Sequence, residues 1–106
     1  MVTTTTGVTE KLDLALTALA GELADLPSLL EDQERGQLTL HERDVRGMEW
    51  GQVMGTIRVI LDPAYRAGKL TPTQAERYRA LLAALKEALP VIEQLGFAQP
   101  QIPLES

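Results

Sequence analysis

The sequence predicts an all-α fold, a small antiparallel helical bundle of three to four helices with extended termini. Two observations support this prediction. Segments of the form Gly-x-Leu-Thr, which begin at Gly36 and Gly68, introduce the polar capping pattern of a helix start. A row of leucines has the average spacing of 3.5 residues that is typical of a packed helix seam. The row comprises Leu12, Leu16, Leu19, Leu23, Leu26 and Leu30.

The composition is that of one ordinary globular domain. The chain has 106 residues, 44% hydrophobic and 4% aromatic, so we expect a core of leucine and alanine. It has no cysteine, which excludes disulfides and favours a reducing compartment. No apolar run is long enough to cross a bilayer, and the N-terminus lacks a signal-peptide pattern. We therefore expect a cytoplasmic protein with no membrane partner, and the many leucines, alanines and arginines favour a bacterial origin.

Three segments are expected along the chain. Residues 1–8 are predicted to be a flexible N-terminal tail, because their threonines have nothing to bury. Residues 9–96 are predicted to form a single helical-bundle domain. Residues 97–106 are predicted to be an extended C-terminal tail, since two prolines prevent regular structure.

The first helix is expected to begin after Thr9, a suitable N-cap, and to follow the leucine row. Pro27 lies inside this row. Because proline removes a backbone donor and clashes with the preceding turn, we expect a kink near residue 26 or, preferably, a break with a restart at Pro27. The segment is expected to end before Gly36.

The second long helix is expected to start at Thr39, where Glu42 completes a capping box. Its apolar positions are expected to face the core, and Asp62-Pro63 is expected to end it. These positions are Val45, Met48, Val53, Ile57, Ile60 and Leu61. Whether residues 40–61 form one continuous helix stays open, because Gly47 could instead terminate a short helix.

The last helix is expected to begin at a second capping box. Thr71 is its N-cap, Pro72 takes the first helical position and Gln74 completes the box. We expect Pro90 to kink this helix and Gly96 to end it.

Three glycines spaced by four, Gly47, Gly51 and Gly55, share one face of the second long helix. Each costs roughly 0.5–1 kcal/mol relative to alanine in a helix interior, so a compensating contact is expected. One hypothesis is a groove that lets a second copy approach closely, with Trp50 and Met54 as apolar anchors. Trp50 could equally be a core residue, which is the preferred interpretation of the largest apolar side chain of the chain. The alternative is a groove filled by leucines of the first helix of the same chain.

No catalytic, cofactor-binding or metal site is expected. His41 is the one histidine and lacks the second histidine of a zinc-protease helix, and the two serines form no hydrolase triad. The segment from Glu31 to Glu42 has the spacing of part of a calcium loop, but Arg35 occupies a ligand position. The sequence therefore predicts a protein that is not an enzyme and has no cofactor.

Charge is unevenly distributed along the chain, whose net charge is −5. Residues 1–34 hold seven acidic residues and one basic residue, whereas residues 35–79 hold eight basic and five acidic residues. The overall acidity argues against nonspecific nucleic-acid binding, which depends on phosphate neutralisation. A helical DNA-binding transcriptional regulator is the alternative function, and its contacts would come from Arg43, Arg46, Arg77 and Arg79.

The predicted function is a protein–protein interaction or adaptor module that self-associates through helix packing. We expect a two-fold homodimer and a further protein partner of unknown identity. The interface hypothesis names Gly47, Trp50, Gly51, Met54 and Gly55. A small-molecule- or metal-binding helical bundle is the third possibility.

Overall fold

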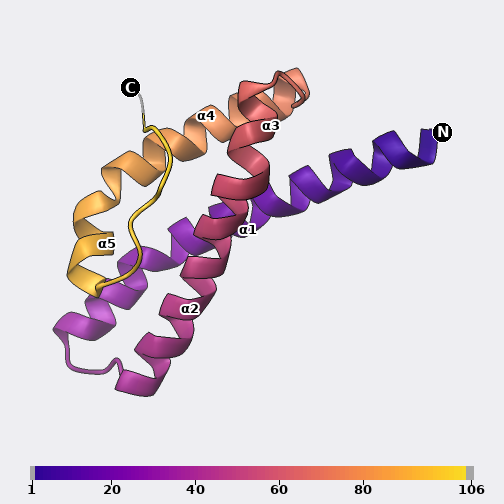
Figure 1. Cartoon of the computed structure of the whole chain (residues 1–106). Coiled ribbons are helices and arrows are strands. Elements are labelled where there is room, and N and C mark those ends of the chain that lie inside the picture. The colour runs from indigo at the N-terminus through magenta and orange to yellow at the C-terminus, as the bar shows by residue number, and fades with distance from the viewer. Residues whose placement is uncertain (1, 105–106) are drawn as a thin grey trace.

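The computed structural model describes the backbone of residues 2–104 and the side chains from Thr9 onward. Within this range it has helices and no strand, which confirms the predicted all-α bundle. The helices are α1 (Val2–Glu34), α2 (Leu40–Thr56), the π-helix η1 (Ile57–Leu61), α3 (Asp62–Arg66), α4 (Pro72–Glu87) and α5 (Leu89–Leu95). They form three arms, which are α1 alone, α2 with η1 and α3, and α4 with α5 (Figure 1).

α1 is the shared partner of the other two arms. It contacts α2 and η1 in the second arm, and α4 and α5 in the third. Its leucine row faces the core as predicted up to Leu26, with Leu16 and Leu19 fully buried, whereas Leu30 does not belong to the core and Leu29 packs against it instead. The other arms cover this row with a set of large buried side chains. They include Trp50, Met54, Ile57, Leu61, Tyr78, Leu82, Leu85, Ile92 and Leu95.

The start of α1 differs from the prediction. The helix begins at Val2 rather than after Thr9, so residues 2–8 continue α1 where a tail was expected, and Met1 lies outside the described residues. Each residue added to an existing helix gains a backbone hydrogen bond, whereas threonine costs at most about 0.7 kcal/mol relative to alanine. The packed part of α1 can therefore continue into the threonine run. Figure 1 shows this end of α1 projecting past the other arms.

Pro27 does not break α1, so the preferred prediction of a break there is wrong. The helix runs through this residue without interruption. Pro27 is exposed, whereas Leu26 is buried and Leu29 packs partly against the core. Burial on both sides of the proline offsets the hydrogen bond that it removes.

The second arm starts as predicted and then continues without a stop. Thr39 Oγ1 accepts a hydrogen bond from the Glu42 N–H at 3.0 Å, and the reciprocal bond completes the capping box. Gly47 lies inside α2 and does not terminate it. The chain stays helical from Leu40 to Arg66.

The expected helix end at Asp62-Pro63 is replaced by a wider turn. Proline clashes with the carbonyl four residues before it in a regular α-helix. Directly before Pro63 the chain forms the π-helix η1, in which the Asp62 N–H donates to the Ile57 carbonyl. A turn with hydrogen bonds five residues apart accommodates the proline and lets the arm continue into α3.

The buried face of the second arm agrees only in part with the predicted one. Of the expected core positions, Val45, Met48 and Ile60 are exposed. The buried positions are Trp50, Met54, Ile57 and Leu61, of which Ile57 and Leu61 were predicted. These four residues also follow helical spacing, and they include the largest apolar side chain of the chain, so burying this face removes more apolar surface from water.

The third arm confirms its predicted start, bend and end. Thr71 Oγ1 accepts from the Gln74 N–H at 3.1 Å within a complete capping box. α4 and α5 are separated at Ala88, two residues before Pro90. Gly96 ends α5 in the left-handed conformation, with φ of 73°, which glycine adopts without steric cost.

The C-terminal tail lacks regular structure, as predicted, but it is part of the packing. Phe97 is buried, and Ile102 and Leu104 pack partly against the core. Figure 1 shows the tail running back along the bundle from the end of α5. The predicted domain boundary at residue 96 therefore leaves out a segment that contributes to the core.

A buried polar contact joins α3 to α4. The Tyr78 hydroxyl donates to Asp62 Oδ1 at 2.8 Å, and Arg66 Nε lies 3.4 Å from Asp62 Oδ2. The Tyr78 ring also packs edge-on against Tyr65, with ring centroids 5.0 Å apart. Burial, together with the hydrogen bond to Asp62, raises the pKa of Tyr78 above its ordinary value of 10.0.

We expect the free energy of unfolding to fall as pH rises above about 10. Tyr78 in the unfolded chain loses its proton near the ordinary pKa of 10.0, whereas the folded chain keeps it, so alkaline pH favours unfolding. Tyr78→Phe removes this contribution and costs about 1–3 kcal/mol at neutral pH, because a buried Asp62 oxygen loses its donor. Urea unfolding at neutral pH and at about pH 11 measures both effects. Equal pH slopes for the two proteins would contradict this role of Tyr78.

Candidate functional site

Two residues of the interface hypothesis lie in the core of the chain. Trp50 is fully buried and Met54 is 6% exposed. The Trp50 indole N–H donates to the Ala98 carbonyl at 2.7 Å, and the ring packs against Phe97 with centroids 6.2 Å apart. Trp50 and Met54 are therefore removed from the interface hypothesis, because the C-terminal tail and the core already cover them.

The three glycines of α2 have different surroundings. A Cβ at Gly47 would lie 3.3 Å from Phe97 Cε1, so this glycine makes room for the tail. The alternative hypothesis expected leucines of α1 to fill this space, but Phe97 fills it instead. A Cβ at Gly51 or Gly55 would meet nothing within 4 Å, so these two glycines border open surface. Packing within the chain therefore accounts for Gly47 and leaves Gly51 and Gly55 unexplained.

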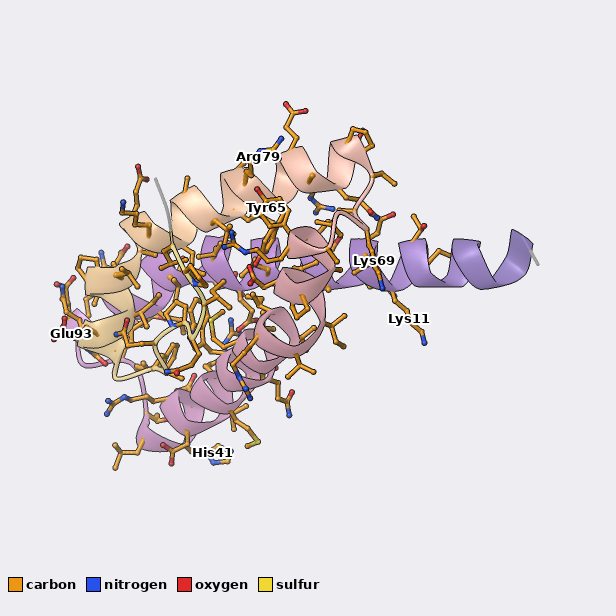
Figure 2. The ribbon with its side chains drawn as sticks, turned by 45° about the horizontal axis from the view of Figure 1, so that its top comes forward. Lys11, His41, Tyr65, Lys69, Arg79 and Glu93 are labelled. Atoms are coloured by element: carbon orange, nitrogen blue, oxygen red, sulfur yellow. The ribbon has the colours of Figure 1, made fainter. Side chains whose placement is uncertain are left out.

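A second row of residues runs along the exposed side of the second arm. Its members are separated by alternating steps of four and three, the same spacing that the buried row has. We call this row the outward face, and it comprises His41, Val45, Met48, Gln52, Gly55 and Val59. In Figure 2, His41 points away from the bundle at the start of this row.

The outward face exposes several large apolar side chains. Val45 is 38% exposed, Met48 and Val59 are both 61% exposed, and the adjacent Ile60 is 52% exposed. Their helical spacing places them along one side of the arm rather than scattered around it. A row of exposed apolar residues with glycine beside it is a surface on which a second helix can pack.

Asp44 and Arg58 border the outward face on the same flank. They are fourteen residues apart, which is close to four helical turns. Both are exposed, and neither forms a salt bridge with any side chain among residues 9–104. Their charges are therefore available to a partner that docks on this side.

The arginines proposed for DNA contact do not form one surface. Figure 2 shows Arg79 of α4 at the top of the view, far from His41 at the start of α2. Arg43 Nε donates to the Leu95 carbonyl at 2.9 Å, and Arg77 Nη2 donates to Thr17 Oγ1 at 3.3 Å. These hydrogen bonds hold elements of the bundle together.

Arg46 belongs to an ion-pair cluster between α1 and α2. Its Nη2 lies 2.6 Å from Asp25 Oδ2, and its Nε lies 3.5 Å from Glu49 Oε1. The hydrogen bond to Asp25 holds the pKa of Arg46 above its ordinary value. Burial raises the pKa of nearby Glu22, against the opposing charge of Arg46. Arg46 therefore positions α2 on α1.

A groove of about 720 Å³ lies between α3 and α4. Tyr65 and Leu82 contribute apolar surface, and Arg66, Arg79 and Lys86 contribute positive charge. Figure 2 shows Tyr65 and Arg79 on the same side of the molecule. The residues that line the groove include neither histidine nor serine.

No group of three or more metal-ligating side chains gathers in the described part of the chain. None of its helices combines the length and hydropathy that a membrane span requires. Comparison with models of protein families, with curated protein sequences and with solved structures finds no match for this chain. The functional assignment therefore depends on the geometry of the chain itself.

We expect alanine to stabilise the chain more at Gly21 than at Gly47. Both glycines lie inside helices, where alanine gains about 0.5–1 kcal/mol. A Cβ at Gly21 meets nothing within 4 Å, whereas at Gly47 it lies 3.3 Å from Phe97, which must move. Urea unfolding of Gly21→Ala and Gly47→Ala compares the two sites. Equal increases in the free energy of unfolding at both sites would show that Phe97 moves aside without an energetic penalty.

Proposed function

We propose that the protein is a non-enzymatic helical interaction module that self-associates through the outward face of its second arm. The observation that carries this proposal is the exposed apolar row around Met48 and Val59, in which Gly55 borders open surface, as does the neighbouring Gly51. In a monomer these side chains stay in water, and the two glycines only weaken the helix. A second copy would bury the side chains and use the space beside the glycines.

The other functions considered have less support from the geometry. DNA binding through the four arginines is disfavoured because Arg43 and Arg46 make contacts within the chain. A small ligand would bind in the groove beside Tyr65, where Arg66, Arg79 and Lys86 supply positive charge. The proposal includes a cytoplasmic location, which the absence of cysteine from the sequence supports. It also includes a further protein partner.

We expect the wild-type chain to sediment as a dimer at micromolar concentrations and to dissociate on dilution. Met48→Lys places a charge in the proposed contact and gives a monomer with unchanged helix content, because Met48 is exposed in the single chain. The matched control is Leu14→Lys on α1, where a leucine that is 70% exposed lies outside the contact. This control stays dimeric. A wild-type monomer at every concentration tested would refute the proposal.

A further inference from the structure

We infer that the second copy packs antiparallel on the outward face, about a two-fold axis at Gln52, with Met48 of each copy next to Gly55 of the other. This inference rests on the proposed self-association and adds the direction and register of the contact. It follows from the order of residues along the face, from the space at Gly55 and from the charges on one flank.

The order of residues on the outward face is nearly symmetric about Gln52. Val45 lies seven residues before Gln52 and Val59 seven residues after it, while Met48 lies four before and Gly55 three after. In an antiparallel pair related by a two-fold axis, a residue before the axis faces a residue the same distance after it in the other copy. Val45 therefore meets Val59 and Gln52 meets Gln52, and Met48, whose exact counterpart is Thr56, lies within one residue of Gly55.

The space at Gly55 fits this register. A Cβ there would meet nothing within 4 Å, so the single chain leaves room above this backbone. Met48, which is 61% exposed, has an unbranched side chain that adapts to such a space. In a parallel pair each residue would lie beside its own counterpart, so that Met48 would meet Met48 and Gly55 would meet Gly55. Two large side chains would then meet at one level and an empty space would remain at another.

The charges on the flank select the same direction. A two-fold axis that reverses the helix direction keeps each flank beside the same flank of the other copy. Asp44 lies eight residues before Gln52 and Arg58 six after it, so Asp44 of each copy lies near Arg58 of the other. Both side chains are exposed and have no salt-bridge partner among residues 9–104. Two symmetric ion pairs therefore form, and they contribute more to register than to affinity.

Mixing two charge-reversed variants tests the register directly. In Asp44→Lys, position 44 repels Arg58 of the other copy, and in Arg58→Glu, position 58 repels Asp44. Each variant alone is expected to dimerise about tenfold more weakly than the wild type. An equimolar mixture restores dimerisation, because both opposite-charge pairs form between one copy of each variant. Sedimentation velocity measures all samples, and Glu76→Lys, an exposed charge reversal on α4, is the control that leaves dimerisation unchanged.

Disulfide mapping gives an independent readout, because the chain has no cysteine of its own. Val45→Cys mixed with Val59→Cys is expected to cross-link faster than either variant alone. Faster cross-linking of each variant with itself, or a mixture of charge variants no more dimeric than its components, would overturn the antiparallel register. A wild type that stays dimeric in that case would keep the proposed function. A wild type that is monomeric would overturn both.

Discussion

Burial of the leucine row of α1 is the constraint on which the bundle depends. The second and third arms both pack on this one helix, so the arrangement of each is set by how it covers the row. The ion pair between Arg46 and Asp25 and the hydrogen bond from Gln74 Nε2 to Asp13 Oδ1 add orientation to this apolar contact. Because the second arm lies against α1 with one side, its other side stays uncovered. The outward face is a consequence of this geometry.

The C-terminal tail decides which side of α2 is buried. Phe97 packs over Gly47 and against Trp50, and the Ala98 carbonyl accepts the Trp50 N–H. The indole thus has both its apolar ring and its polar hydrogen satisfied inside one chain. With Trp50 turned inward, Met48 and Gln52 are turned outward, because residues two apart on a helix lie on different faces. The tail therefore determines which residues of α2 are exposed, although the tail itself is not part of the outward face.

Local features of the fold were predictable from the sequence, and features that depend on distant contacts were not. The capping boxes at Thr39 and Thr71 and the left-handed Gly96 follow from residues within one turn, and the structure has all three. The continuity of α1 through Pro27 depends on leucines packing against other arms. For α2, two rows share the same spacing, so periodicity alone could not tell the buried row from the exposed one. The second row itself was visible in the sequence as a repeated four-three pattern through Met48.

The π-helix η1 also fixes how the two ends of the second arm are rotated relative to each other. A π-turn holds one more residue than the α-helical turn it replaces, and one residue of an α-helix corresponds to a rotation of about 100°. The extra residue therefore determines which way α3 faces after the proline. It brings Asp62 under the Tyr78 hydroxyl while Val59 and Ile60 remain in solvent. The widened turn thus allows the second arm to contact α4 through α3 at one end. The same arm presents the outward face along the rest of its length.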